Sequence, residues 1–398
     1  MRFEDLLQRF VPGRRAGNGA AGAVPCPDAA AAGPADAPPL AAGIAIATDT
    51  QEARQTAIFT AEGMRLARQE DWDRFETCFR ALDRSRASTP GGTHLADLLA
   101  RGARADVVGP IRQVLSDPGL LSAHAPRGGI AALESLLPAY PDHHGLALVV
   151  SHAHIDIAWA WRGCDLLAEV PARHWRAFHH HLDRASAILD PFDPFSLDSP
   201  ALAAARCAHL PGDPAPGQRV CDDYEDLIDL DPANPRHLRA LGVHLLPRWF
   251  GSYTRLHAEA LRAMERSRDL WGRGGYALVL MDAACIDRAA LSAADSALLV
   301  QALRDLVRHK PDADMLNRVA AFCAGQLQRA EPGPQGYRAG LTGTLRQVLA
   351  APLTVLHPLI WAVPAAGAAH GALSDAERSR RGLDLARATL ANLPGGRA

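Results

Sequence analysis

Two short stretches interrupt the chain in the same way, and they constrain its fold more than any other feature. Ile188–Pro194 and Ile228–Pro235 each follow an apolar segment with helical spacing and end it with Asp and Pro. The second stretch leads into another helical run that opens at Arg236. Proline cannot continue a helix but is tolerated in the first turn of the next one. The two stretches therefore predict short junctions between helices, and the chain is expected to form an array of helices.

The composition favours the same fold class. The chain has 398 residues, and 48% of them are hydrophobic, mostly alanine and leucine, while only 6% are aromatic. Alanine and leucine favour helices over sheets, and a chain of this length is long enough for one extended array. We find no segment with a convincing alternation of period 2, so no strand is expected.

Charge and cysteine usage exclude several classes of function. The formal net charge is −2, which gives no reason to expect a nucleic-acid partner or an anionic membrane surface. The seven cysteines are scattered without a Cys-x-x-Cys pair, which is typical of free thiols in a reducing compartment. The sequence shows neither a secretory signal nor a run of about 18 apolar residues. We expect a cytoplasmic protein with no membrane partner.

Three regions are expected along the chain. Residues 1–50 are predicted to hold a short amphipathic helix over 1–10 and a disordered linker rich in Ala, Gly and Pro over 11–47. Residues 51–290 are predicted to form the helical array, and residues 291–398 add helices that continue or cap it. Within the array, the apolar stripe from Leu146 to Leu167 and the next helix after Val170 predict an antiparallel hairpin.

The second junction resembles tetratricopeptide repeats, in which Leu-Asp-Pro-x-Asn-Pro ends one repeat and a Leu-Gly pair lies in the next helix. Here, Leu230–Pro235 and Leu241-Gly242 match that pattern. Pro247–Ser252 and Trp271–Tyr276 are similar to segments of uncharacterised bacterial helical-repeat proteins. The resemblance covers about residues 140–290 and implies an all-α solenoid of stacked antiparallel helix pairs. Asp190 and Asp231 lie 41 positions apart, whereas the repeat period is about 34, so the repeats are degenerate.

One motif could carry metal chemistry. His152, His154 and Asp156, followed by Trp159, resemble the zinc motif of the α-mannosidase family of glycoside hydrolases, His-x-His-x-Asp-x-x-Trp. In a strand the three side chains would share one face and could bind zinc. In a helix, His152 and His154 would be about 200° apart, and only His152 and Asp156 would share a face. The helical spacing of the surrounding stripe favours the second structure, in which no metal is bound.

Four residues are candidates for binding a partner. Arg248 and Trp249 stand in the predicted turn 247–252, either as a structural corner or as part of a binding groove. Arg and Trp are the residue types most often found at binding hot spots. Arg162 and Tyr253 complete the set as further expected contacts.

The expected function is a non-enzymatic binding protein with no cofactor, whose stacked helices present a surface to a protein or peptide. One alternative is a zinc-dependent hydrolase that uses His152, His154 and Asp156. Another is a ligand-binding helical domain with a pocket between the helices expected over 143–168 and 236–246. The local structure of residues 150–158 discriminates between the binding protein and the hydrolase.

Overall fold

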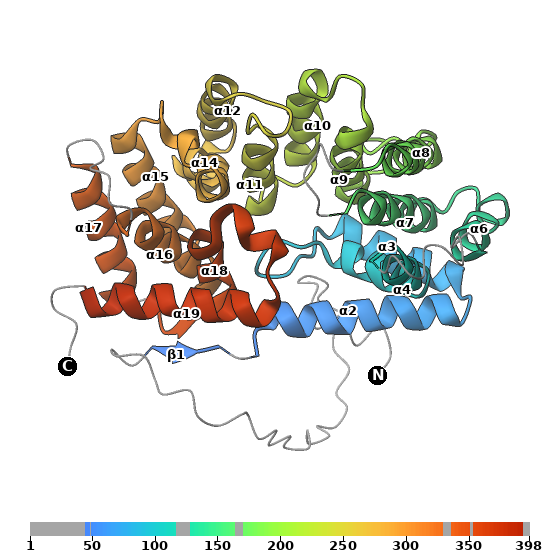
Figure 1. Ribbon diagram of the computed structural model, residues 1–398, viewed down its shortest axis with the longest axis horizontal. Helices are drawn as coiled ribbons and strands as arrows, with labels where there is room; N and C mark the ends of the chain where they lie inside the picture. Colours follow the sequence, from blue (N-terminus) through green and yellow to red (C-terminus); the bar gives the residue numbers. More distant parts are fainter. Residues whose placement is uncertain are drawn as a thin grey trace, which may run out of the picture.

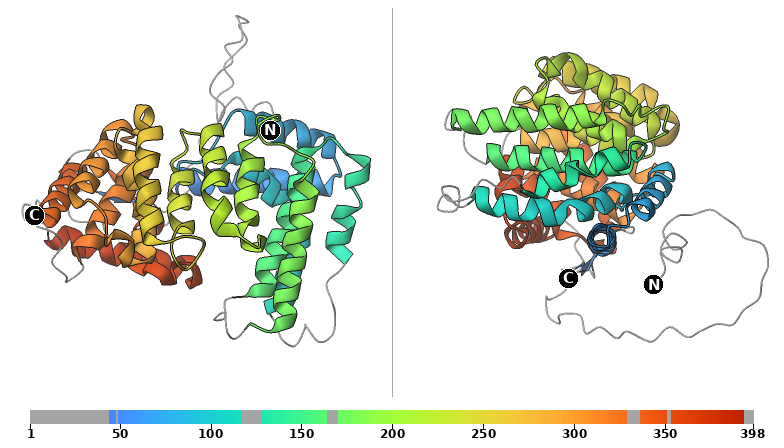
Figure 2. Two further views of the ribbon diagram at one scale, coloured as in Figure 1. Left: turned by 90° about the horizontal axis from the view of Figure 1, so that it is seen from above. Right: turned by 90° about the vertical axis from the view of Figure 1, so that its right-hand side faces the viewer.

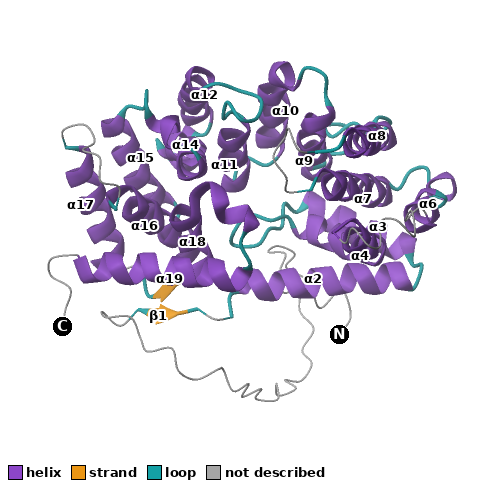
Figure 3. Cartoon of the chain, viewed as in Figure 1, coloured by secondary structure: helices purple, strands orange, loops and turns teal. Residues whose placement is uncertain are grey.

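The computed structural model describes residues 44–47, 49–116, 128–163, 170–328, 336–350 and 353–392. Its fold is all-α, with stacked helices in a solenoid-like arrangement, as the sequence predicted (Figures 1 and 3). Within these ranges, none of the helices has the length and apolarity that crossing a lipid bilayer requires. The predicted helix over 1–10 and the linker up to residue 43 lie outside the described residues.

The helices fall into two halves that follow one another along the long axis of the molecule (Figure 1). The N-terminal half contains α2 (Gln51–Arg68), α3 (Trp72–Arg84), α4 (Leu95–Ser116), α6 (Gly128–Glu134), η1 (Leu137–Ala139), α7 (His144–Arg162), α8 (Ala172–Leu189), α9 (Pro200–His209) and η3 (Leu210–Gly212). The C-terminal half contains α10 (Pro216–Leu230), α11 (Pro235–His244), α12 (Tyr253–Arg266), α13 (Arg268–Trp271), α14 (Gly274–Ile286), η4 (Arg288–Leu291), α15 (Ser296–His309), α16 (Ala313–Leu327), α17 (Tyr337–Ala350), α18 (Pro358–Ala366), η5 (Gly367–Ala372) and α19 (Asp375–Asn392).

Each half has its own large hydrophobic core. The N-terminal core gathers side chains of α2, α3, α4 and α7, and the C-terminal core gathers those of α10 to α19. Helix α9 contributes to both cores, with Leu202 in the first and Cys207 in the second. A third, smaller cluster lies between α7 and α8, which run side by side as a long hairpin (Figure 2). This hairpin is the one that the sequence predicted, although positions 164–167 of the predicted stripe lie outside the described residues.

Both junctions form where the sequence placed them. Helix α8 ends at Leu189, and helix α10 ends at Leu230. Asn234 then caps α11, because its side-chain oxygen accepts a hydrogen bond from the Arg236 amide at 3.1 Å. Pro235 occupies the first turn of α11, where its missing N–H would have no helical partner.

Several helices pack against partners that are not their neighbours in the chain. Helix α2 packs along α4, and α11 packs along α14. Gly242 allows the second contact, because a Cβ atom at this position would lie 1.7 Å from the Val279 carbonyl oxygen of α14. The Leu241-Gly242 pair therefore has a structural reason, which is the close approach of two helix backbones.

The expectation that the chain has no strand was wrong at one place. Ala45–Ile46 (β1) pairs in parallel with Val355–Leu356 (β2), and the buried side chain of Ile44 belongs to the C-terminal core. The linker predicted to extend to residue 47 therefore has an ordered end from residue 44. The pairing joins segments about 310 residues apart, and local periodicity carries no information about such a contact.

Candidate functional site

A row of aromatic rings connects the α7–α8 hairpin with the turn that follows α11. The ring centroids of Trp175 and Phe178 are 5.5 Å apart, those of Phe178 and Trp159 are 5.2 Å apart, and those of Trp159 and Trp249 are 6.1 Å apart. All three contacts are edge-to-face, a geometry that the quadrupoles of aromatic rings favour. We name these four residues the aromatic strip.

Three of the four tryptophans that are exposed or partly exposed belong to the aromatic strip. The chain has seven tryptophans. Three of them are at most 4% exposed and belong to the large cores: Trp72, Trp271 and Trp361. The other four are only partly buried and lie on α7, α8 or the turn after α11: Trp159, Trp161, Trp175 and Trp249. Because Trp249 is 37% exposed, it is the ring of the strip with the most surface open to solvent.

The turn that carries Trp249 is held in place by its own hydrogen bonds. The Trp249 amide donates to the Leu246 carbonyl at 2.9 Å, and the Phe250 amide donates to the His244 carbonyl at 3.0 Å. The His244 ring stacks on Phe250 at 5.6 Å and meets Trp249 at 5.9 Å. The exposed tryptophan is therefore supported by backbone hydrogen bonds and by ring contacts within its own turn, and the turn predicted over 247–252 is confirmed.

Arginines flank the aromatic strip. Arg248 is exposed next to Trp249, and Arg173 and Arg176 are exposed on either side of Trp175. Among the described residues, none of these three guanidinium groups forms an ion pair. Arg162 lies one helical turn beyond Trp159 on α7, and its Nη1 donates to the Gly163 carbonyl at 2.9 Å.

Tyr253 has a different environment from the other expected contacts. It begins α12, and its hydroxyl donates a hydrogen bond of 2.7 Å to Asp287 at the end of α14. The structure thus brings Trp249 into the aromatic strip and Arg248 beside it, whereas the hydroxyl of Tyr253 is engaged within the C-terminal half.

The segment of the α-mannosidase-like motif is helical, since His152–Asp156 lies inside α7. The Asp156 carboxylate accepts hydrogen bonds from Arg104 Nε at 2.7 Å and from Arg112 Nη2 at 2.8 Å, both on α4. Burial, together with the charge of Arg104, lowers the pKa of His152 to about 4. The expected helical geometry is therefore observed, and the carboxylate of the motif is engaged by two arginines.

His154 faces away from this pair. Its Nδ1 lies 2.8 Å from His181 Nδ1 on α8, and its Nε2 lies 3.2 Å from a Glu134 carboxylate oxygen on α6. Glu134 also accepts a hydrogen bond from Arg184 at 2.6 Å. Since these partners lie on α6 and α8, the structure does not bring His154 together with His152 and Asp156 into one ligand set.

A different histidine cluster, which the sequence did not predict, lies where the two halves meet. His94 precedes α4, Asp231 follows α10, and His237 is in the first turn of α11. Among the described residues, these three form the one group of potential metal ligands with closely spaced donor atoms. Asp231 belongs to the second junction and His237 follows that junction by two residues, but no sequence signal connects either of them with His94, which is 137 positions before Asp231.

The Asp231 carboxylate dominates the electrostatics of this cluster. Burial alone would raise the pKa of Asp231, but the hydrogen bonds of His237 and His94 hold it well below its usual range. Burial alone would lower the pKa of His94, but the hydrogen bond and charge of Asp231 raise it. For His237, burial outweighs the carboxylate and the pKa is lowered. The carboxylate is therefore ionised in a buried environment.

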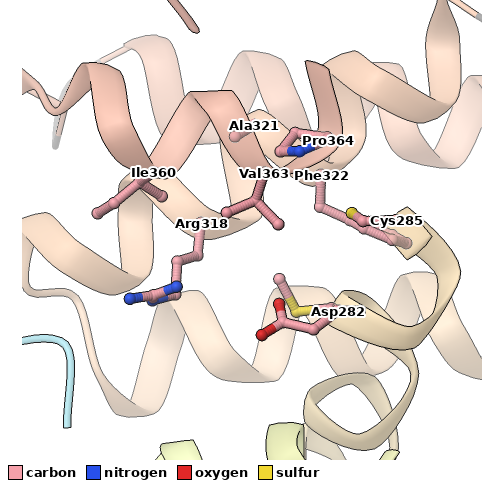
Figure 4. Close-up of a pocket in the computed structure, with 9 residues that line it drawn as sticks. Asp282, Cys285, Arg318, Ala321, Phe322, Ile360, Val363 and Pro364 are labelled. Carbon is pink, nitrogen blue, oxygen red and sulfur yellow. The ribbon is translucent and has the colours of Figure 1, made fainter. Parts of the chain in front are cut away.

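Two hollows in the structure lie in other places than the expected ligand pocket. A cavity between α14, α16 and α18, lined by Asp282, Arg318 and Pro364 among others, holds about 10 Å³ (Figure 4). That space accommodates roughly one water molecule and no larger ligand. A hollow of about 390 Å³ lies between α16, α17 and α19. Both hollows lie away from the pocket that was expected between the 143–168 and 236–246 helices.

Comparisons of the chain with protein-family models, with curated proteins and with solved structures found no match. The resemblance to tetratricopeptide repeats therefore stays a prediction, and the functional argument starts from the geometry of the chain itself.

Proposed function

We propose that this protein is a non-enzymatic helical array that binds a protein or peptide partner across the aromatic strip. The observation that carries the proposal is the gathering of the partly exposed tryptophans around the α7–α8 hairpin and the turn after α11. A single exposed apolar side chain is normal on a protein surface, but a cluster of tryptophans is a common feature of an interaction site.

The mounting of the strip supports this role. Trp159 and Trp175 pack against Phe178 of the small α7–α8 core, and Trp249 rests on Trp159. Rings that are already held in one arrangement lose little conformational entropy when a partner covers them. The aromatic strip therefore offers apolar surface whose side chains were already ordered when the protein folded, so binding a partner orders them little further.

The flanking charges indicate the chemistry of the partner. Arg173, Arg176 and Arg248 add positive charge beside the strip. An arginine can stack on an aromatic ring and can also donate two hydrogen bonds to one carboxylate. We expect the partner to present apolar or aromatic side chains together with Asp or Glu.

The α-mannosidase-like alternative has less support. It requires His152, His154 and Asp156 to converge, whereas Asp156 is bound by two arginines and His154 is bound by His181 and Glu134. Helical geometry separates the two histidines, as the sequence argument anticipated.

The test is affinity capture with the wild-type protein and two variants. In the first variant, Arg248→Ala and Trp249→Ala are combined. In the second, Phe195→Ala removes another exposed aromatic ring, which is 49% exposed and lies beyond the opposite end of α8. Loss of a hot-spot tryptophan costs about 2 kcal/mol or more, so the first variant should bind its partner at least about 30-fold more weakly. The second should bind normally.

Circular dichroism and the unfolding midpoint of each variant show whether the fold is intact. If the double variant folds and retains every partner that the wild type retains, the aromatic strip is a structural corner and the proposal is wrong.

A further inference from the structure

Three buried side chains from distant parts of the chain direct donor atoms to one point. His94 Nε2 and His237 Nε2 each lie 3.0 Å from Asp231 Oδ2, and the two nitrogens lie 3.4 Å from one another. The three residues are between 3% and 5% exposed. We propose that His94, Asp231 and His237 form a binding site for a single divalent ion of the zinc type, which joins the two halves of the array.

The spacing of the donor atoms fits such an ion. Zinc binds imidazole nitrogen and carboxylate oxygen at about 2.0–2.1 Å, so neighbouring ligand atoms of a tetrahedral site lie about 3.3 Å apart. The observed separations of 3.0 and 3.4 Å are close to that value. Two imidazoles and a carboxylate are also the donor set that zinc and related transition metals accept, while calcium and magnesium prefer oxygen alone.

The surroundings of His94 favour a cation. The charges of Asp231, Asp97 and Asp83 all act on the His94 ring. Moreover, the Oδ1 atom of Asp97 is buried and has no hydrogen-bond partner within the described residues. Arg236, whose Nη1 donates to Thr93 Oγ1 at 3.1 Å, is the arginine whose charge acts on His237. A divalent ion would place positive charge beside the buried Asp231 carboxylate, whose negative charge is costly to bury and now has the two histidines as partners.

The segment that carries His94 is already fixed in the position that the site requires. The Asn234 side-chain amide donates to the Gly92 carbonyl at 3.0 Å, and Arg239 Nη2 donates to the Gly91 carbonyl at 3.1 Å. Gly92 has a φ of 87°, a conformation that favours glycine, and an added Cβ would lie 2.4 Å from Asn234 Oδ1. The turn before α4 therefore docks against the second junction, and the three donor atoms are placed by contacts that do not involve a metal.

Three protein ligands leave at least one coordination position for water. Because the ligands are buried, a substrate would have little access to that position, so the ion would act as a structural link and not as a catalyst. This role does not depend on the proposed partner-binding function, since the aromatic strip lies at a different part of the molecule.

The test begins with wild-type protein that has been freed of metal by a chelator and then dialysed. We expect it to bind one equivalent of Co²⁺ per chain, with the visible absorption of cobalt bound to nitrogen and oxygen, and to release the cobalt when Zn²⁺ is added. We also expect Zn²⁺ to raise the unfolding temperature, because an ion that binds only the folded state stabilises it. Wild-type protein that binds no stoichiometric Co²⁺ or Zn²⁺ would overturn the proposal.

Two histidine variants locate the bound ion. His237→Gln should weaken Co²⁺ binding by at least about 100-fold, since it removes a direct ligand and even outer-shell changes cost about 10–100-fold. His154→Gln is the matched control, because His154 is another buried histidine with a histidine and a carboxylate as neighbours. Binding that survives in His237→Gln and is lost in His154→Gln would place the ion elsewhere and overturn the proposal. If His237→Gln does not fold, Asp231→Asn provides the same comparison.

Discussion

Replacing Gly242 by alanine tests the close packing of α11 on α14, on which the C-terminal half depends. The new Cβ would lie 1.7 Å from the Val279 carbonyl oxygen and 2.8 Å from the carbonyl carbon. Cβ atoms almost never approach other atoms within 3.0 Å, so the two backbones would have to separate by about 1.3 Å along this contact. Because the clash is with backbone, no rotation of a side chain can relieve it.

Two opposing effects determine the expected loss of stability. Alanine is favoured over glycine inside a helix by about 0.5–1 kcal/mol. Overpacking of a well-packed core costs about 1–3 kcal/mol, and a backbone clash belongs at the upper end of that range. We therefore expect Gly242→Ala to lower the free energy of unfolding by about 2 kcal/mol.

The matched control is Gly343→Ala in α17. Its added Cβ would meet only the end of the flexible Arg304 side chain, at 3.4 Å. The helix-propensity gain should then appear alone and raise the free energy of unfolding by about 0.5–1 kcal/mol. Urea denaturation followed by circular dichroism measures both variants, with an unchanged slope as the sign that only stability has changed. A Gly242→Ala protein as stable as Gly343→Ala would refute the packing argument.

Two further predictions concern the buried carboxylate of Asp83 and the partly buried carboxylate of Asp156. Burial raises the pKa of Asp83 to about 6. The folded protein therefore binds this proton more tightly than the unfolded chain does, and the protonated carboxyl group contributes its full stabilisation below about pH 4. Up to about 3 kcal/mol of the free energy of unfolding is lost as the pH rises through 6. Urea midpoints across this pH range should show the decline in the wild type and not in Asp83→Asn, and equal pH profiles would contradict the prediction. Asp156→Ala should cost about 1–3 kcal/mol, because it leaves the buried Arg104 without its carboxylate. Asp106→Ala, which breaks the exposed ion pair between α4 and Arg68 of α2, should cost at most about 1 kcal/mol in the same assay, and equal losses would argue against a role for burial.

Local patterns in the sequence were enough to predict the helices and the junctions between them. Phe75, Phe79 and Leu82 have the three- and four-residue spacing of a core-facing helix, and all three side chains are fully buried in α3. The Asp and Pro residues at 231 and 235 predicted the boundary between α10 and α11. These signals are reliable because helix periodicity and capping depend on residues only a few positions apart.

The contacts between distant segments could not be predicted in this way. The Thr89–Gly92 turn and the Asp231–Pro235 junction each look like a simple helix terminator in the sequence. In the structure they pack against one another and bring His94 to Asp231 and His237. The conspicuous His152 and His154 are separated by helical geometry. In contrast, His94, which has no motif around it, joins Asp231 and His237 in the cluster with closely spaced donor atoms.

Photo-crosslinking from position 249 tests the proposed binding surface most directly. A photoreactive phenylalanine analogue replaces Trp249 in one protein and Phe195 in another, and both proteins are irradiated in the cells that produce the chain. We predict a discrete covalent adduct with one partner from position 249 and none from position 195. Equal labelling from both positions, or no adduct from position 249 in a folded protein, would contradict the proposal that the aromatic strip binds a partner.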